Sequence, residues 1–166
     1  MKVINSFFGE YEFLSNFYMT PVLYEGLLYP SSEHAYQAAK TIILKERMMI
    51  LNCKTPGQAK RMGSKKAKKI TLRPGWDSMR VDIMINVVLS KFKNPELALK
   101  LLSTKNLQLI EGNQWHDNYW GECYCEDCKS FSKENKLGFV LTLVRSGLNL
   151  ELIHKRKSNN ENIICN

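Results

Sequence analysis

An apolar stripe with the period of an α-helix runs through the middle of this chain and constrains its fold more than any other feature. Its members recur every three or four residues: Val81, Met84, Ile85, Val88, Leu89 and Phe92. This spacing puts all of them on one face of a helix. We therefore predict a helix from Trp76 to Phe92.

Residues that start or stop helices predict further helices on both sides of this one. Ser31 or Ser32 can cap a helix over 32–51, whose first turn holds an acidic residue at the positive end of the helix dipole. Pro56 suits the first position of a helix over 55–62, and Gly63 can stop it. Two more helices are predicted over 94–104 and 135–147. Extended segments are predicted at 107–111 and at 21–29, where we expect Glu25-Gly26 to form the turn of a short hairpin.

These elements predict a mainly α chain with a small N-terminal β element. With 166 residues, of which 44% are hydrophobic and 24% charged, the chain has the size and composition of one globular domain. We assign that domain to residues 1–150, followed by a polar C-terminal tail at 151–166 that is expected to fray from Lys155. Neither a bilayer-spanning apolar run nor the apolar stretch of a signal peptide is present, so a cytoplasmic location and no membrane partner are expected.

The charge of the chain favours an anionic partner. Its formal net charge is +8 and its pI is near 9.3, which suits a phosphorylated small molecule or a nucleic acid. Part of the charge lies in the run 60–69, which is either a phosphate-binding patch or a solvated helix end and loop. The abundance of lysine and asparagine hints at an AT-rich genome such as that of a phage or large virus, in which case the location is the host cytoplasm.

Three polar side chains share one face of the predicted helix at 32–51. Glu33, Gln37 and Lys40 are spaced i, i+4 and i+7, among residues that are otherwise largely apolar or small. A carboxylate, an amide and an amine aimed together out of an apolar helix indicate a binding or catalytic site. The alternative is a solvated stripe with a salt bridge, which charged stripes usually are.

Two further clusters carry chemistry. In the segment 115–121, aromatic residues that could stack on a base surround Asp117, which could act as an acid or base or bind a ribose hydroxyl. The alternative is a loop whose aromatic side chains fill the core and whose Asp117 caps a turn. The run Cys123-x-Cys125-x-x-Cys128 has the spacing of metal ligands and suits a structural zinc ion, but free thiols in a loop are the preferred interpretation. The fourth ligand it lacks could come from one of three residues: Cys53, His116 or His34. His34 is otherwise expected to be a packed or surface histidine.

The order of these motifs resembles the YbiA-like family, also called the NADAR family. The resemblance starts with Phe13-Leu14-Ser15-Asn16-Phe17, a short hairpin and the Glu33, Gln37, Lys40 pattern, and it runs from about residue 7 to about 148. Its remaining pieces follow in family order: Pro56, Ala59-Lys60, Gly63, Trp76, Arg80, Met84, Lys91-Phe92, Leu101-Leu102-x-Thr104, Ile110-Glu111, Asp117-x-x-Trp120-Gly121, Asn135-x-Leu137-Gly138 and Arg145. No single piece is specific, but the ordered set is. The cysteine run makes the segment after Gly121 longer than in the simplest relatives.

The resemblance implies a single YbiA-like helical domain and an N-glycosidase that needs no cofactor. Such enzymes hydrolyse the bond between ribose C1 and a nitrogen. The substrate implied here carries a phosphorylated ribose, either ribose 5-phosphate on an aminopyrimidine of the riboflavin pathway or ADP-ribose on guanine, including ADP-ribosylated nucleic acid. A viral protein would favour the second substrate.

The resemblance also suggests roles for individual residues. Glu33 and Asp117 are the candidates for the carboxylate near C1 and the acid that protonates the base, in an order left open. Lys40 either forms a Schiff base with the opened sugar or pairs with phosphate or with Glu33. The expected binding residues are Asn16 and Gln37, which would hydrogen-bond the ribose or base, and Trp76 and Trp120, which would stack. Arg80, Lys91 and Arg145 would either hold phosphate or tie the core together. Arg145 has a buried structural ion pair as its main alternative, and Glu111 is as readily structural as functional.

Two other classes of function remain as alternatives. A domain that senses ADP-ribose without cleaving it would keep the binding residues and leave the carboxylates away from the ligand. A small basic nucleic-acid-binding module with the cysteine run as a zinc knuckle would bind DNA or RNA with a steep dependence on salt. The second accounts for the lysine run but not for Glu33, Gln37 and Lys40.

Overall fold

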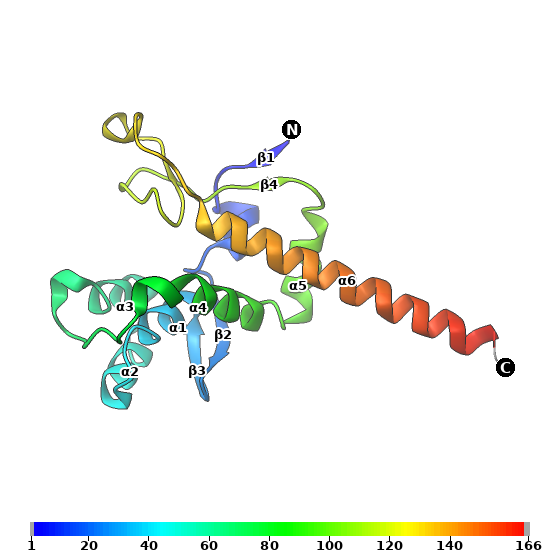
Figure 1. Ribbon diagram of the computed structural model, residues 1–166, viewed down its shortest axis with the longest axis horizontal. Helices are drawn as coiled ribbons and strands as arrows, with labels where there is room; N and C mark the ends of the chain where they lie inside the picture. Colours follow the sequence, from blue (N-terminus) through cyan, green and yellow to red (C-terminus); the bar gives the residue numbers. More distant parts are fainter. Residues whose placement is uncertain (1, 165–166) are drawn as a thin grey trace.

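The computed structural model describes residues 2–164, with side chains through His154, and it has the mainly α fold predicted from the sequence (Figure 1). The α-helices are α1 (Ser32–Ala38), α2 (Leu44–Leu51), α3 (Pro56–Met62), α4 (Trp76–Lys91), α5 (Pro95–Ser103) and α6 (Lys136–Ile164). Three short 3₁₀ turns are η1 (Gly9–Leu14), η2 (Lys65–Ala67) and η3 (Glu126–Cys128). The strands are β1 (Val3–Ile4), β2 (Met19–Tyr24), β3 (Leu27–Ser31), β4 (Gln108–Leu109), β5 (Gly112–Asn113) and β6 (Glu122–Cys123).

The strands form three separate pairs. β2 and β3 make the predicted antiparallel hairpin, and its two-residue turn has positive φ at both Glu25 (43°) and Gly26 (79°), as tight hairpins prefer. Val22 and Tyr29 face each other across this hairpin and are both buried against the helices. The other two pairs, β1 with β4 and β5 with β6, are parallel, and the first of them joins segments that are distant in sequence.

Helix α4 lies at the centre of the core, where it contacts α1, α6 and β2. The buried face of α4 is formed by Ile83, Met84, Val87 and Val88. This face is rotated from the predicted stripe, because Leu89 is 43% exposed. The helix itself spans the predicted range, and Pro56 and Pro95 also stand at the first positions of α3 and α5, behind the capping residues Thr55 and Asn94.

The single helix predicted over 32–51 is wrong, because the chain breaks into α1 and α2. The break contains the β-branched run Thr41-Ile42-Ile43, which favours extended over helical backbone. The Thr41 hydroxyl accepts a hydrogen bond from the backbone N–H of Ile43 (3.1 Å), and the Thr41 carbonyl accepts one from Nε of Arg47 (2.8 Å). Lys40 therefore lies in the turn after α1 instead of on its surface.

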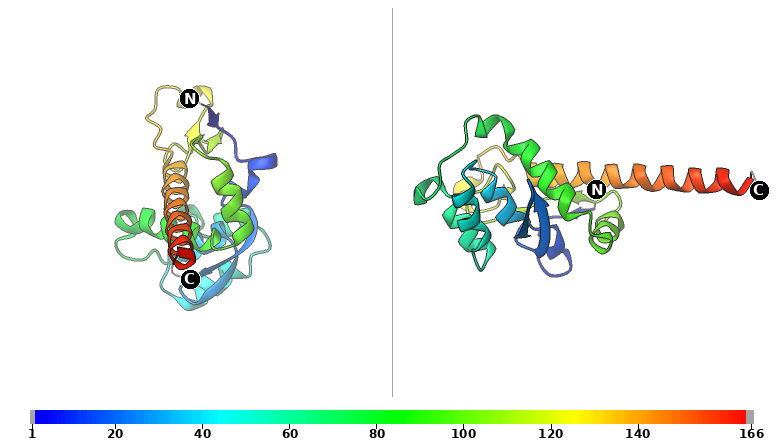
Figure 2. Two further views of the ribbon diagram at one scale, coloured as in Figure 1. Left: turned by 90° about the vertical axis from the view of Figure 1, so that its right-hand side faces the viewer. Right: turned by 90° about the horizontal axis from the view of Figure 1, so that it is seen from below.

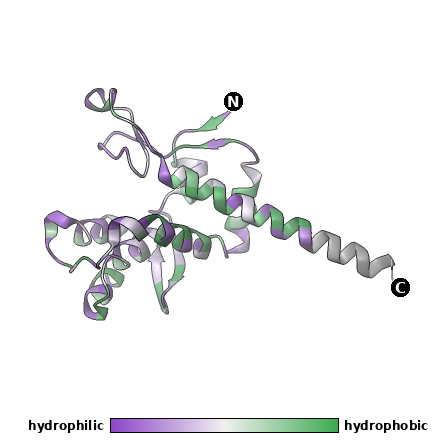
Figure 3. Cartoon of the chain, viewed as in Figure 1, coloured by the Kyte–Doolittle hydropathy of each residue, from purple (hydrophilic) through white to green (hydrophobic). Residues whose placement is uncertain are grey.

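The last helix is longer than predicted, because α6 passes Gly147 and continues to Ile164. Gly147 does not adopt the left-handed conformation with which glycine ends many helices, and apolar residues continue along α6 beyond it (Figure 3). The helix extends away from the rest of the chain in Figure 1 and in the right-hand view of Figure 2. The tail predicted to fray from Lys155 is thus helical backbone as far as it is described, and its last two residues lie outside the described part.

The predicted extended segment at 107–111 contains β4, whose pairing with β1 the sequence did not indicate. Across residues 2–164, no helix is both long enough and apolar enough to span a bilayer.

Candidate active site

A cavity of about 1070 Å³ opens between α1, α3, α4 and the segments around β5. Eight of the ten predicted catalytic and substrate-binding residues line it: Asn16, Glu33, Gln37, Lys40, Trp76, Arg80, Asp117 and Trp120. Glu33 and Gln37 are only 6% and 4% exposed. The solvated stripe considered for these residues is therefore wrong, because both side chains are buried.

Helix α1 forms the floor of the cavity and is held on several sides. The Ser31 hydroxyl caps it by accepting a hydrogen bond from the backbone N–H of His34 (3.3 Å). The His34 ring lies between the Ser31 hydroxyl (2.7 Å) and the Cys53 carbonyl (3.1 Å), and burial lowers its pKa. His34 is thus a packed histidine, as expected. The backbone N–H of Glu33 donates to the Asn16 carbonyl (3.0 Å), which fixes the Asn16 loop against α1.

The Glu33 carboxyl group is buried and accepts a hydrogen bond from Nε2 of Gln37 at 2.8 Å. Burial raises its pKa, while the bond from Gln37 and the positive charges of Lys60 and Lys40 act in the opposite direction. The group can therefore hold a proton at a higher pH than a free glutamate.

Two amide oxygens in the cavity have unmet hydrogen-bonding capacity. Oδ1 of Asn16 and Oε1 of Gln37 are buried, and neither has a hydrogen-bond partner within the described part of the chain. Nδ2 of Asn16 contacts only the sulfur of Met84, at 3.4 Å. Because an unpartnered buried polar group costs about 1–3 kcal/mol, these atoms make the cavity a candidate binding site for a polar ligand.

The Lys40 amine reaches back over the cavity from the turn after α1. Its Nζ donates to the Gly63 carbonyl (3.1 Å) and lies 5.6 Å and 5.9 Å from the ring centroids of Tyr36 and Trp76. Burial lowers the pKa of this amine, although the negative charge of Glu33 opposes the shift. This shift favours the neutral amine, which is the form that a nucleophile needs.

Aromatic rings form one wall of the cavity. Tyr36, which the sequence analysis did not single out, places its ring centroid 5.3 Å from those of both Trp76 and Trp120. Tyr36 follows Glu33 by three residues, so its helical spacing was the available signal. The edge-on contact of 80° between Tyr36 and Trp120 fixes these rings as a wall for a planar group.

Three more residues with carboxyl groups line the cavity: Asp77, Glu111 and Asp117. Oδ1 of Asp117 accepts hydrogen bonds from the backbone N–H groups of Tyr119 (3.2 Å) and Trp120 (2.9 Å), so Asp117 both caps a turn and lines the cavity. Glu111 also lines the cavity. Burial, followed by the negative charges of Asp117 and Glu33, raises the pKa of Glu111 to about 8.

Basic residues form part of the rim of the cavity. Lys60, Arg61, Lys65 and Lys66 line the cavity, so part of the lysine run faces this site and not only solvent. Nζ of Lys60 lies 5.7 Å from the ring centroid of Phe17 and 5.8 Å from that of Trp115. On the opposite side, the Arg80 guanidinium lies 3.7 Å from the ring centroid of Tyr119.

The two remaining predicted binding residues, Lys91 and Arg145, do not line the cavity. Lys91 is buried behind it, where Nζ donates to the Ser15 carbonyl (2.7 Å) and burial lowers its pKa to about 7. Nη1 of Arg145 donates to the Thr104 hydroxyl (2.7 Å) and the Leu107 carbonyl (3.1 Å). Arg145 thus ties the core together through neutral partners and not through the ion pair that was considered.

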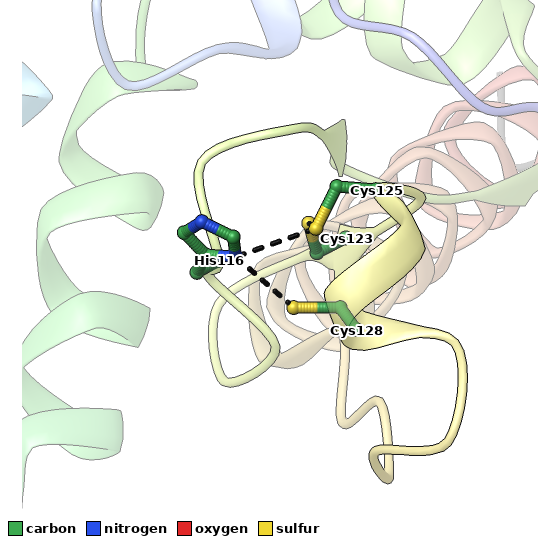
Figure 4. Close-up of side chains that lie close together, drawn as sticks. All are labelled: His116, Cys123, Cys125 and Cys128. Atoms are coloured by element: carbon green, nitrogen blue, oxygen red, sulfur yellow. Dashed lines mark hydrogen bonds between the residues drawn. The ribbon is translucent and has the colours of Figure 1, made fainter.

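A separate cluster beside the cavity could bind a metal such as zinc. Four ligand atoms lie within 4.8 Å of one another (Figure 4), and they belong to His116, Cys123, Cys125 and Cys128. Among the three residues considered for the fourth ligand, the structure brings His116 to the thiols. His34 packs instead against Cys53, away from this cluster.

Known proteins are similar to this chain over most of its length. The sequence profile of the NADAR domain matches residues 6–149. The N-glycosidase YbiA of Escherichia coli K12 is 34% identical over 143 residues, which cover 86% of this chain and 84% of that protein. A riboflavin biosynthesis protein of Vibrio vulnificus is 34% identical over 82% of this chain, which spans 35% of that longer protein.

The fold agrees with this relationship. The NMR structure of the E. coli protein YbiA superposes with a TM-score of 0.76 and 31% sequence identity, covering 92% of this chain and 88% of that one. A profile match to most of the chain, a relative of similar length and a shared fold all lead to the same family. This chain belongs to the NADAR domain family.

Proposed function

We propose that this N-glycosidase hydrolyses the C–N bond between a phosphorylated ribose and a nitrogenous base. The substrate class comprises ADP-ribosylated guanine, free or in nucleic acid, and the phosphoribosyl-aminopyrimidine of riboflavin synthesis. Relatives bear the names N-glycosidase and riboflavin biosynthesis protein, which supports the reaction and one of the two substrates.

One observation carries the proposal: a buried carboxyl group faces a large cavity next to amide oxygens that have no partner. The carboxyl group is that of Glu33, on α1. The amide oxygens belong to Gln37, on the same helix, and to Asn16, on the adjoining loop. A ribose offers hydroxyl groups that can donate to these oxygens, and the aromatic wall offers a surface for a base. The basic rim is suited to phosphate.

The reaction needs one carboxyl group that gives a proton and one carboxylate that stabilises positive charge. As the C–N bond breaks, positive charge grows on C1 and negative charge on the departing nitrogen. Burial raises the pKa of Glu33 and Glu111, so we assign the proton donor to this pair. Asp117, fixed through two backbone N–H groups, is assigned to the charge at C1 and to the attacking water. Water adds its hydroxyl to C1, and its remaining proton restores the acid.

Lys40 has two roles open to it in this scheme. Its depressed pKa supports attack of a neutral amine on the aldehyde of the opened sugar, which would give a Schiff base and release water. Its place between Glu33 and the basic rim equally supports binding of a phosphate oxygen. These roles differ in whether a covalent link to the sugar forms.

The proposal is tested with wild type, Glu33→Gln and the control Glu96→Gln. Glu96 is an exposed residue of α5 that is paired with Lys100 and does not line the cavity. Each protein receives guanine-ADP-ribosylated DNA and the phosphoribosyl-aminopyrimidine, and mass spectrometry follows the released base and sugar. We expect release by wild type and the control, and at least a 100-fold loss in Glu33→Gln.

The outcomes separate the alternatives. The preferred substrate of wild type identifies the biological role within the class. Tight ADP-ribose binding without release of base from either substrate would contradict the proposal and favour a sensing domain. Affinity for plain DNA that falls steeply with salt, again without base release, would instead favour a nucleic-acid-binding module.

A further inference from the structure

We propose that a zinc ion binds beside the cavity and fixes the loop that carries Trp115 and Asp117. Its ligands are one imidazole and three thiolates: His116, Cys123, Cys125 and Cys128. The ion joins the two ends of the segment that runs from β5 to η3, and this segment supplies part of the cavity wall.

The positions of the four ligand atoms carry this assignment. Nδ1 of His116 lies 3.3 Å from Sγ of both Cys125 and Cys128, and the Sγ atoms of Cys123 and Cys125 are 3.2 Å apart. Ligand atoms of a tetrahedral zinc ion with Zn–S bonds of about 2.3 Å lie roughly 3.8 Å from one another. The three distances given above are shorter than this spacing, and no pair of the four atoms is more than 4.8 Å apart, so small side-chain shifts would bring all four to a common ion (Figure 4).

The backbone at His116 adopts a less common conformation that turns the imidazole toward the thiols. His116 has φ of 64°, in the left-handed region that residues other than glycine adopt rarely. A conformation of this kind persists only where surrounding contacts compensate for its strain. Here it directs the ring toward the three sulfur atoms, and a bond from Nδ1 to a metal ion supplies the compensation.

The chemistry of the donor set selects zinc. Three sulfur atoms and one imidazole nitrogen form a Cys₃His set, which holds structural zinc in tetrahedral geometry. Each thiol releases its proton to solvent as its Zn–S bond forms, and the imidazole binds as the neutral ring. Since the protein fills all four positions, no position is open to a reacting water. The ion is therefore structural.

The ligands lie directly next to cavity residues. His116 stands between Trp115 and Asp117 in the sequence, and both of these residues line the cavity. Cys123 lies in β6, which pairs with β5 at the cavity edge. Apart from the metal, side-chain hydrogen bonds such as the one from Nδ2 of Asn113 to the Asp117 carbonyl (2.7 Å) hold this loop.

Metal analysis of the intact chain tests the site. The protein is purified without metal-affinity steps, and zinc is measured in wild type, Cys125→Ser and the control Cys53→Ser, whose thiol is outside the cluster. We expect about one zinc per chain in wild type and control, and at least a tenfold loss in Cys125→Ser. Replacement by Co²⁺ should give wild type the absorption bands of a tetrahedral thiolate site. Wild type without zinc or these bands, even after supply of equimolar metal, would overturn the assignment.

Hydrogen exchange tests the role of the ion and needs no folded variant. Amide exchange is compared for wild type before and after removal of zinc by a chelator, with the segment 112–128 as the region of interest. We expect at least tenfold faster exchange there and little change in α4. Zinc loss that leaves exchange at 112–128 unchanged would refute the fixing role. Both measurements are independent of base release, so they stand or fall separately from the proposed reaction.

Discussion

Replacing Gly63 with alanine perturbs the closest approach between two helices that build the cavity. A Cβ added at this position would lie 2.0 Å from Oε1 of Gln37 and 2.9 Å from its Cβ. The amide group can rotate away, but the Cβ of Gln37 is fixed to α1. Alanine therefore also forces α1 and the end of α3 apart by a few tenths of an ångström. The backbone at Gly63 is not itself the obstacle, because its φ of −78° suits any residue.

The expected loss of stability follows from three contributions. Rotation of the Gln37 amide breaks its hydrogen bond to Glu33, which is worth about 1–3 kcal/mol in a buried setting. Overpacking between the helices costs about 1–3 kcal/mol more. The higher helix propensity of alanine returns less than about 1 kcal/mol. The free energy of unfolding should fall by about 2–5 kcal/mol, which lowers Tm by roughly 5–15 °C in a chain of this size.

Thermal and urea unfolding measure this loss, with Gly147→Ala as the matched control. A Cβ added at Gly147, within α6, would meet nothing within 4 Å. That variant should gain about 0.5–1 kcal/mol from helix propensity and keep its base release. Gly63→Ala should also lose at least tenfold in base release, because Gln37 no longer holds Glu33. If the two variants were equally stable and equally active, the close approach of Gly63 to Gln37 would not matter and our reasoning would be wrong.

Three further predictions concern pH, Lys40 and Arg145. Burial raises the pKa of Glu111 to about 8, so the folded chain keeps a proton that the unfolded chain loses above about pH 4.5. The contribution of Glu111 to the free energy of unfolding is therefore present in acid and is lost as the pH rises from about 4.5 through 8, at up to about 1.4 kcal/mol per pH unit. Urea unfolding between pH 5 and 7, below the range where the depressed pKa of Lys91 acts in the opposite direction, should therefore show a flatter pH dependence for Glu111→Gln. Lys40→Arg should lose base release at least tenfold, and borohydride added during turnover should link sugar to wild type alone; an active Arg variant would leave only the phosphate role. Arg145→Met should lower the free energy of unfolding by about 2–4 kcal/mol, because two buried acceptors lose their donor, while base release per folded molecule stays unchanged.

Local signals in the sequence predicted the starts of helices correctly. They did not predict the break after α1 or the pairing of β1 with β4. Ser31, Pro56 and Pro95 mark the starts of α1, α3 and α5 because capping and the fixed φ of proline act within a few residues. The break at Thr41 was missed, although its β-branched neighbours were visible, because the helical period of the flanking residues continues across it. The parallel pairing of β1 with β4 depends on contacts about a hundred residues apart, which no local pattern reveals.

The same distinction applies to the site. Glu33 and Gln37 could be found because their spacing on a helix sets their direction. Lys91 and Arg145 were misplaced, because a basic residue on a partly apolar helix suits a phosphate site and a buried carbonyl equally well. In the structure Lys91 donates to the Ser15 carbonyl and Arg145 to the Thr104 hydroxyl, so both side chains are used inside the core. His116 became distinguishable from the other possible fourth ligands only when the loop brought it to the cysteines.

The cavity is built from segments that range from Phe7 to Trp120, so its walls close a loop of more than a hundred residues. The entropy of such a closure is recovered only when most of the chain is in place, which makes the cavity a late product of folding. Opening the cavity by unfolding likewise requires separation of the first and second halves of the chain. A ligand that touches both halves should therefore slow proteolysis throughout the domain, in proportion to its concentration relative to its Kd, and not only at the residues it contacts.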